Sequence, residues 1–194
     1  MQLVLASGSP RRYELIRSLG LDFEVRVPAV DEELLAGEDA RSYVLRLARE
    51  KALAVAGPGE AVLGADTSVL HGDDIIGKPR GLGDARRILA RLEGQTHTVL
   101  TGVALVWQAD DGPCVDVELC RSDVRMQPMT EAEIASYVET GEPLDKAGAY
   151  ALQGIGAAFV AEVRGSPTNV IGLPLHHAVA MLRSVGIVVL GEPC

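Results

Sequence analysis

Two acidic groups in the sequence have residue types and positions that suit binding a divalent cation or accepting a proton. Asp66 interrupts the otherwise apolar segment VLGADTSV, and Asp31 and Glu32 belong to an acidic run that precedes a helical pattern. Carboxylates are depleted in strand interiors and rare in cores unless they are paired or bind a metal. Hard oxygen ligands of this kind suit Mg²⁺ or Mn²⁺, which complete their shell with water and phosphate oxygens. The alternatives are a turn cap for Asp66 and a solvated surface for the acidic run.

Cationic residues occur at matching places: at the ends of elements, in loops or on a buried stripe. Together they offer bidentate guanidinium groups and point charges, which a polyphosphate requires. They are Arg11, Arg12, Lys51, Lys78 and Lys146. Lys51 falls on the apolar stripe of its helix. Because burying an unpaired ammonium is costly, its side chain either snorkels to the surface or meets an anion in a cleft.

The segment LASGSPRRYELI at residues 5–16 passes from an apolar strand into a helix. Helix N-termini bind anions, because their first N–H groups lack internal partners and carry partial positive charge. The same segment also fits an ordinary capped helix start, with Ser9 as the N-cap, Pro10 in the first turn, and Arg11 and Arg12 as solvated charges. The segment alone favours neither interpretation.

Signatures of other phosphate and metal enzymes are absent from the sequence. It contains no GxxxxGK[ST], no GxGxxG after a strand and no histidine pair with zinc spacing. This argues against a P-loop kinase, a dinucleotide enzyme and a zincin. His176 and His177 stand at a predicted helix start, where capping or solvent exposure is expected. His97 lies in a strand pattern and is interpreted as a core histidine.

The composition narrows the class of protein. The 194 residues include 27 acidic and 18 basic side chains, a formal net charge of −9, which argues against nucleic-acid and anionic membrane partners. No apolar run approaches the roughly 20 residues of a membrane span, and the N-terminus lacks a secretory signal pattern, so we expect a cytoplasmic protein. The cysteines lack metal-site spacing and are expected to be free thiols. They are Cys114, Cys120 and Cys194.

Hydrophobic periodicity predicts the elements that must position these groups. Strands are predicted at 2–6, 23–27, 61–70, 74–79, 96–108, 114–126 and 157–163. Helices are predicted at 10–19, about 40–56, 84–94, 130–141 and about 174–185. The residues at 96–126 have the pattern of a long hairpin around the turn ADDGP. Strands and helices alternate before this hairpin, so we expect one α/β domain over residues 1–194 with a mixed sheet.

Three of these helices carry more detailed predictions. The first is expected to bury Tyr13, Ile16 and Leu19 on one face. In the fourth, Thr130 and Glu133 have the spacing of a capping box. The second helix has an apolar stripe that consists of Tyr43, Val44, Leu47, Ala48, Ala54 and Val55.

Over nearly its whole length the chain resembles the Maf-like nucleoside triphosphate pyrophosphatases. The resemblance rests on LASGSPRR, VDE, GADTSV, GKP, LEGQTHTVLTGV, GEPLDKAGAYALQG and GSPTNVIGLPL. It implies an elongated mixed α/β sheet with flanking helices and a cleft between two lobes, related to the inosine triphosphate pyrophosphatases and often dimeric, so a homodimer is one expectation. It also implies hydrolysis of a nucleoside triphosphate to the monophosphate and pyrophosphate with a divalent cation. DKAGAYALQG is similar to the branch that acts on dTTP and UTP.

The resemblance also implies roles for single residues. The proton acceptor of the family falls on Asp66. Base selectivity falls on Arg11, Thr67 and Gln153, and phosphate and metal binding falls on Ser7, Arg11, Lys51, Asp31, Glu32 and Lys78. Our hypothesis is that Mg²⁺ or Mn²⁺, held by Asp66 with Asp31 or Glu32, neutralises charge while water attacks the α-phosphorus. The loop from Ser7 to Arg12 would hold phosphate oxygens.

The base and the class of function each leave an alternative open. The amide of Gln153 can pair with the O4 and N3–H edge that uracil and thymine share, or it can bond nearby backbone as a structural amide. The alternative function is a nucleotide-binding regulator of cell division without significant catalysis, since the family name derives from a septation phenotype. The sequence supports this little, because it contains no disordered binding tail or large apolar patch signal.

Overall fold

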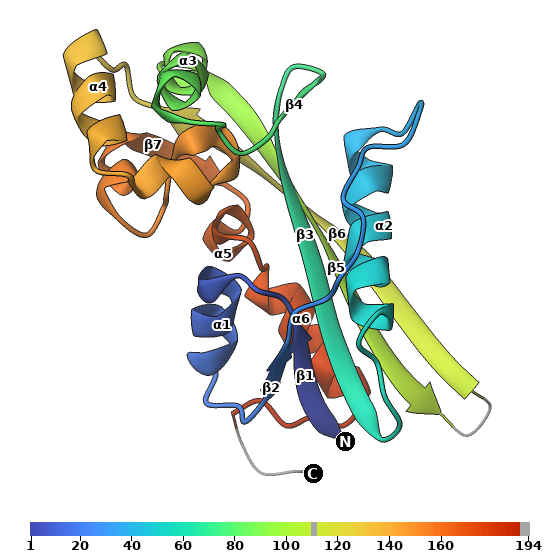
Figure 1. Cartoon of the computed structure of the whole chain (residues 1–194). Helices are drawn as coiled ribbons and strands as arrows, with labels where there is room; N and C mark the ends of the chain where they lie inside the picture. The colour runs from blue at the N-terminus through green and yellow to red at the C-terminus, as the bar shows by residue number, and fades with distance from the viewer. Residues whose placement is uncertain (110–111, 191–194) are drawn as a thin grey trace. The chain divides into compact units, whose positions relative to one another are not determined.

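The computed structural model describes residues 1–109 and 112–190. Within these residues, a seven-stranded mixed sheet has the strand order β2-β1-β3-β5-β6-β7, and β4 pairs with β3 (Figure 1). The strands are β1 (Gln2–Ala6), β2 (Glu24–Arg26), β3 (Glu60–His71), β4 (Asp74–Ile76), β5 (Thr96–Ala109), β6 (Gly112–Met126) and β7 (Val160–Arg164). The α-helices are α1 (Pro10–Arg17), α2 (Ala40–Leu53), α3 (Leu82–Leu92), α4 (Glu131–Glu139), α5 (Pro167–Ile171) and α6 (Leu175–Ser184). This confirms the predicted mixed α/β sheet with flanking helices.

Parallel and antiparallel pairs both occur in the sheet. Strand β1 pairs in parallel with β2 and with β3, whereas β4 is antiparallel to β3 and β7 is antiparallel to β6. The contacts divide the chain into two compact units that interleave along the sequence. Unit 1 consists of residues 1–66, 101–120 and 172–194, and unit 2 of residues 67–100 and 121–171. The single domain over residues 1–194 and the cleft between two lobes remain predictions.

In unit 1, two glycines allow helix α2 to approach the sheet closely. A Cβ built on Gly64 of β3 would lie 2.4 Å from the carbonyl oxygen of Ala48, and one built on Gly102 of β5 would lie 2.2 Å from that of Val44. These distances are far below van der Waals contact, so a side chain at either position would push α2 away from the sheet. Alternate residues of a strand share a face, so Asp66 continues the row of Gly64 on the face that meets α2.

In unit 2, the carboxylate of Glu142 holds the loop between α4 and β7. Its Oε1 accepts hydrogen bonds from the Tyr137 hydroxyl at 2.7 Å and from the backbone N–H of Gly156 at 2.9 Å, and its Oε2 accepts one from the N–H of Ile155 at 3.0 Å. The Tyr137 oxygen in turn accepts a hydrogen bond from the N–H of Ala151 at 3.1 Å. The loop is therefore fixed from within by one partly buried polar network.

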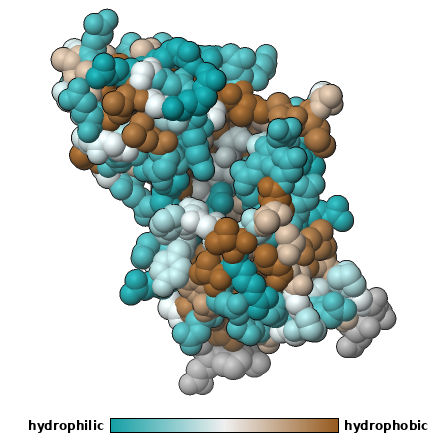
Figure 2. Space-filling view, in the orientation of Figure 1, coloured by the Kyte–Doolittle hydropathy of each residue, from teal (hydrophilic) through white to brown (hydrophobic). Residues whose placement is uncertain are grey.

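The surface over α3 and α4 in unit 2 is mostly hydrophilic, as Figure 2 shows at its upper left. Arg86 of α3 and Glu139 of α4 form an ion pair at 3.2 Å there. The predicted capping box of α4 is confirmed, because Thr130 and Glu133 satisfy each other's backbone N–H groups. Within the described residues, no helix is both long enough and apolar enough to cross a membrane.

Several details differ from the sequence-based predictions. Tyr13 is 38% exposed and packs against Phe23, while α1 buries Leu15 with Ile16, because the amphipathic tyrosine ring is tolerated at the surface. Helix α2 ends at Leu53, so Ala54 lies outside it and is exposed.

Other differences concern short elements. The predicted strand at 157–163 begins only at Val160, because residues Ile155–Phe159 form a 3-10 helix. Helix α5 was not predicted, since five residues are too few to show a helical period. Cys114 and Cys120 are free thiols, as predicted. Cys194 and residues 110–111 of the predicted hairpin turn lie outside the described residues.

Candidate active site

The side chain of Lys51 lies between two carboxylates in unit 1. Its Nζ is 2.7 Å from Oδ1 of Asp66 and 2.6 Å from Oε1 of Glu32. The side chains of Lys51 and Asp66 are only 8% and 10% exposed, whereas that of Glu32 is 56% exposed. The snorkelling alternative for Lys51 is therefore wrong. The three side chains, called the Lys51 cluster below, form a buried ion pair with a third charge at the surface.

Burial dominates the electrostatics of Asp66. It raises the pKa of this carboxyl group above its ordinary value, attraction to Lys51 and Arg12 offsets the effect only in part, and Glu32 adds to it. A raised pKa means that the ionised carboxylate takes up a proton more readily than an exposed aspartate does. The ion pair with Lys51 therefore does not fully offset the cost of burying the charge of Asp66.

The acidic run before α2 is tied to that helix by two side chains. The hydroxyl of Tyr43 donates a hydrogen bond to the carbonyl oxygen of Glu32 at 2.8 Å. Arg46 pairs with the carboxylate of Glu38 at 2.7 Å. Asp31 is exposed, and its Oδ1 accepts a hydrogen bond from the backbone N–H two residues further on at 2.9 Å. Tyr43 and Arg46 thus position Glu32, so that the side chain of Glu32 can reach Lys51.

The segment between β1 and α1 brings Ser7 and Arg12 together. The side chain of Ser9 caps α1 by accepting the N–H of Arg12 at 3.5 Å, which confirms the predicted cap. The hydroxyl of the buried Ser7 accepts a hydrogen bond from Arg12 at 3.4 Å, and Nε of Arg12 donates one to the carbonyl oxygen of Gly172 at 2.7 Å. Burial lowers the pKa of Arg12, and the negative charge of Asp66 opposes this effect.

The remaining predicted substrate residues are not all assembled here. Thr67, Lys78 and Gln153 belong to unit 2. Thr67 directly follows Asp66 in β3, Lys78 is exposed just after β4, and Gln153 is exposed in the loop before β7. Their roles toward the Lys51 cluster remain predictions.

Two other predicted cations have different surroundings. Arg11 is partly exposed, and its positive charge contributes to lowering the pKa of Arg12. Lys146 is in unit 2, where its Nζ donates to the carbonyl oxygen of Glu142 at 2.6 Å and contacts Asp145 at 2.5 Å. Lys146 therefore supports the loop that Glu142 fixes.

The three histidines with sequence-based predictions differ in burial: His97 is buried, His177 is partly buried and His176 is exposed. His97 is 2% exposed, its Nε2 lies 2.8 Å from the hydroxyl of Tyr150, and burial lowers its pKa to about 4. The predicted core histidine is thereby confirmed. His176 is exposed and His177 contacts the carboxylate of Glu118. Of the two expectations for this helix start, solvent exposure holds for His176, whereas no side chain caps α6 from its N-cap position, Pro174.

The donor set of the Lys51 cluster fits a hard divalent cation. Asp66 contacts Lys51 through one carboxylate oxygen, and Glu32 offers an exposed carboxylate at the same ammonium. One or two carboxylates with substrate phosphate oxygens are what Mg²⁺ usually takes. The three predicted ligands Asp31, Glu32 and Asp66 do not by themselves gather within 4.8 Å in the described part of the chain. Any such site would therefore need oxygens from a bound phosphate or from water.

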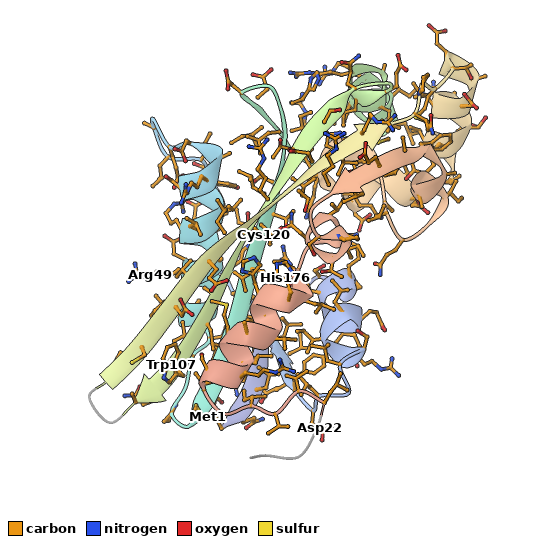
Figure 3. All side chains as sticks on the ribbon, turned by 180° about the vertical axis from the view of Figure 1, so that it is seen from behind. Met1, Asp22, Arg49, Trp107, Cys120 and His176 are labelled. Atoms are coloured by element: carbon orange, nitrogen blue, oxygen red, sulfur yellow. The ribbon has the colours of Figure 1, made fainter. Side chains whose placement is uncertain are left out.

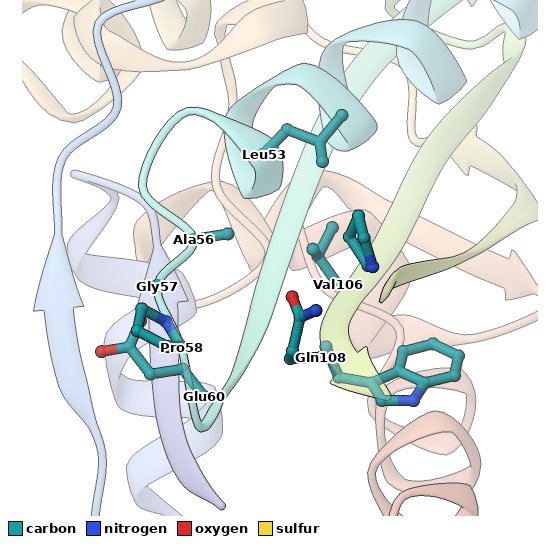
Figure 4. Close-up of a pocket in the computed structure, with 9 residues that line it drawn as sticks. Leu53, Ala56, Gly57, Pro58, Glu60, Val106 and Gln108 are labelled. Carbon is teal, nitrogen blue, oxygen red and sulfur yellow. The ribbon is translucent and has the colours of Figure 1, made fainter. Parts of the chain in front are cut away.

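A pocket of about 250 Å³ lies elsewhere in unit 1, where the end of α2 approaches β3 and β5 (Figure 4). Its lining includes Leu53, Ala56, Glu60, Val106 and Gln108. Glu60 is already paired with Arg26, at 2.6 Å. None of the predicted site residues lines this pocket, so it is not the candidate active site.

Sequence reasoning missed the residues that position the site. Gly64 and Gly102 let α2 bring Lys51 to Asp66, and their signal was an isolated glycine inside each strand, which often marks a close backbone approach. Tyr43 was assigned to the apolar stripe of its helix. Its hydroxyl group was the available signal, because a buried tyrosine oxygen usually needs a partner.

The chain is similar to known proteins along almost its whole length. Residues 2–185 match the family described as Maf-like protein. The chain belongs to the Maf-like family. The relatives of this Maf-like protein include the dTTP/UTP pyrophosphatase of Anaeromyxobacter dehalogenans (strain 2CP-C), 55% identical over 95% of this chain and 94% of the relative. The dTTP/UTP pyrophosphatase of Myxococcus xanthus (strain DK1622) is 49% identical over 95% of this chain and 93% of the relative. The dTTP/UTP pyrophosphatase of Symbiobacterium thermophilum is 48% identical over 95% of this chain and 94% of the relative.

Proposed function

We propose that this Maf-like protein is a nucleoside triphosphate pyrophosphatase that hydrolyses dTTP and UTP to the monophosphate and pyrophosphate. The observation that carries the proposal is the buried pair of Lys51 and Asp66, with Glu32 on the same ammonium. A buried charge pair is weak evidence of stability, and it suits a site that must handle a charged substrate. The names of relatives that are 48% to 55% identical over almost the whole chain support the same activity.

Asp66 orients the attacking water and accepts its proton in this proposal. The burial that raises its pKa makes it a better base, while Lys51 keeps it ionised when no substrate is bound. General base catalysis typically raises the reaction rate by a factor of about 10² to 10⁴. The rest of the barrier is lowered by positioning and by charges that are fixed before the substrate arrives.

Lys51, Arg12 and Ser7 bind the triphosphate. The ammonium of Lys51 can exchange Glu32, which is largely exposed, for a phosphate oxygen at little desolvation cost. Arg12 is held by Ser7 and by the carbonyl oxygen of Gly172, so its guanidinium is oriented in advance. The first N–H groups of α1 add partial positive charge beside Ser7.

A divalent cation, Mg²⁺ or Mn²⁺, would be held by Asp66 together with Glu32 or Asp31. When bound, it would neutralise charge that develops on the triphosphate during hydrolysis. Asp66 would then both help to hold the cation and accept the proton from water. A homodimer is proposed on the family resemblance alone, and a cytoplasmic location stays a sequence-based prediction.

Gln153 is proposed to read the base, together with Thr67 and Arg11. An amide offers one acceptor and two donors, which match the O4 and N3–H edge of uracil and thymine. Cytosine reverses this pattern, so CTP should be a poor substrate. Loss of a polar partner in a closed site costs about 1–3 kcal/mol, or roughly 5- to 150-fold in selectivity.

The test is pyrophosphate release from dTTP, UTP and CTP with Mn²⁺ or Mg²⁺, for the wild type, Gln153→Leu and the matched control Gln95→Leu. We expect catalytic release from dTTP and UTP that a chelator abolishes. Gln153→Leu should narrow the preference over CTP by losing dTTP and UTP activity, and Gln95→Leu should not, because Gln95 is another exposed glutamine of unit 2. Stoichiometric nucleotide binding without release would contradict the enzyme and favour a nucleotide-binding regulator. An intact preference in Gln153→Leu would show that the base is read elsewhere.

A further inference from the structure

Three side chains with metal-binding atoms meet in unit 1 outside the Lys51 cluster. Within the described residues, the ligand atoms of Cys120, His176 and His177 all lie within 4.8 Å of one another. Figure 3 labels Cys120 on β6 and His176 at the beginning of α6, and shows the two near each other. None of the three has a role in the proposed hydrolysis.

The local structure explains how these residues meet. In β6, Val115 and Val117 pack on the core that includes Ala48 of α2, so the alternate residues Glu118 and Cys120 face the other side of the sheet. Helix α6 lies on that side, because His177 contacts the carboxylate of Glu118. The two histidines occupy the first turn of α6, and their ring centroids are 4.2 Å apart.

The donor set is that of a soft or borderline divalent cation. A thiolate and two imidazoles are ligands of Zn²⁺, which takes three protein ligands and an open position in many sites. In a tetrahedral zinc site with bonds of about 2.0–2.3 Å, the ligand atoms would lie roughly 3.3–3.8 Å apart. The ligand atoms here lie up to 4.8 Å apart, so side-chain movements of about 1 Å would bring them to these distances. By contrast, the hard carboxylates of the Lys51 cluster suit Mg²⁺ or Mn²⁺.

The carboxylate of Glu118 is positioned to hold the ring of His177 without binding the metal itself. Histidines that bind a metal commonly donate their other ring N–H to a carboxylate, which fixes the ring and its tautomer. Glu118 contacts Nδ1 of His177, and in the tautomer with a proton on Nδ1 this leaves Nε2 as a lone-pair donor.

We propose that Cys120, His176 and His177 form a binding site for Zn²⁺ or a similar soft divalent cation, with Glu118 orienting His177. The site is independent of the proposed hydrolysis. It would join β6 to the first turn of α6, a short distance along the chain from Gly172, whose carbonyl oxygen accepts the hydrogen bond from Arg12. Metal binding would therefore stabilise unit 1 next to the segment that orients Arg12.

The test is titration of the purified full-length protein, reduced and free of tags, with Co²⁺ as a spectroscopic probe and with Zn²⁺ in competition. We expect a sulfur-to-cobalt charge-transfer band and tetrahedral d–d bands at one Co²⁺ per chain, displaced by Zn²⁺. Cys120→Ser should abolish the charge-transfer band. The matched control Cys114→Ser, at the other free cysteine of β6, should keep it. Asp66→Asn should also keep it, which separates this site from the Lys51 cluster.

Two further variants guard against a folding defect in Cys120→Ser. His176→Gln changes an exposed side chain and should weaken Co²⁺ binding at least tenfold while the melting temperature without metal stays unchanged. Glu118→Gln should weaken Co²⁺ binding about 10- to 100-fold. A wild-type protein without the sulfur-to-cobalt band, a band that Cys114→Ser removes, or unchanged affinity in His176→Gln would overturn the proposal.

Discussion

Two carboxylates, the buried Asp66 in unit 1 and the partly buried Glu142 in unit 2, differ in how the chain compensates their charge. Glu142 accepts hydrogen bonds from Tyr137, Ile155 and Gly156. Burial acts to raise its pKa, but these hydrogen bonds outweigh burial and the pKa is lowered. For Asp66, burial outweighs Lys51 and Arg12, and the pKa is raised.

This difference is between a carboxylate whose charge the fold compensates and one whose charge the fold leaves under-compensated. Glu142 is matched to donors that mostly belong to the backbone of its own loop, so its charge is stabilised before any substrate arrives. Among the described residues, the charge of Asp66 is matched incompletely, by the side chains of Lys51 and Arg12. A buried charge that the fold leaves under-compensated is a candidate for function, because a ligand can supply what the fold does not.

Replacing the cation beside Asp66, in Lys51→Met, is expected to have a large effect on catalysis. Methionine keeps the apolar stem and removes the ammonium, so kcat/KM for dTTP should fall at least about 100-fold, in the range observed for loss of one fixed charge or donor. The melting temperature should change by only a few degrees, because Asp66 can take up a proton when its cation is removed. Arg49→Met, at an exposed cation of the same helix, is the control. Wild-type kinetics in Lys51→Met would remove Lys51 from the site.

Acid should weaken unit 2 through His97. Its pKa is about 4 in the folded protein against an ordinary 6.5, so the unfolded state binds the proton more readily. The stabilisation that comes from keeping His97 neutral is fully present above pH 6.5 and is lost as the pH falls toward 4. The loss amounts to roughly 3 kcal/mol of unfolding free energy at most. Denaturant unfolding between pH 7 and pH 4 should show a shallower dependence of the unfolding free energy on pH in His97→Gln than in the wild type. Equal slopes in wild type and His97→Gln would contradict the buried neutral histidine.

A smaller effect is expected for Glu142→Gln. The amide keeps one acceptor and loses the charge, so part of the loop's hydrogen bonding is weakened, at a cost of about 1–3 kcal/mol in unfolding free energy. The same substitution at Glu139, which is exposed in an ion pair with Arg86, should cost less than about 1 kcal/mol. Because the pKa of Glu142 is lowered, its contribution is present above the unfolded pKa near 4.5 and disappears as the pH falls below it. Equal stability of the two variants would show that the network does not hold the loop.

Much of unit 1 could be predicted from the sequence for one physical reason. A charge inside an apolar pattern is expensive, so Asp66 in a strand and Lys51 on a helix stripe both pointed to a partner, and they are partners of each other. The cap at Ser9 and the capping box at Thr130 followed from spacing, because those contacts are local in sequence.

What could not be predicted depends on contacts between distant segments or on the backbone. The donors that compensate Glu142 are mostly N–H groups, which every residue except proline carries and which leave no sequence signature. Cys120 and the pair His176 and His177 meet only because β6 and α6 pack together, and linear spacing therefore excluded a metal site. The exposure of Tyr13 was missed because an amphipathic ring satisfies a helical period on either face.

The most direct test of the central claim compares Asp66→Asn with Asp116→Asn. Both exchange a carboxylate for an amide on a strand residue of unit 1, and only Asp66 contacts Lys51. The measurement is the turnover number for pyrophosphate release from dTTP at saturating Mn²⁺, with the melting temperature recorded on the same samples. The account predicts that Asp66→Asn loses at least about 10³-fold in turnover with little change in melting temperature, and that Asp116→Asn keeps wild-type turnover. Near-normal turnover in Asp66→Asn would contradict the assignment of the Lys51 cluster as the catalytic centre.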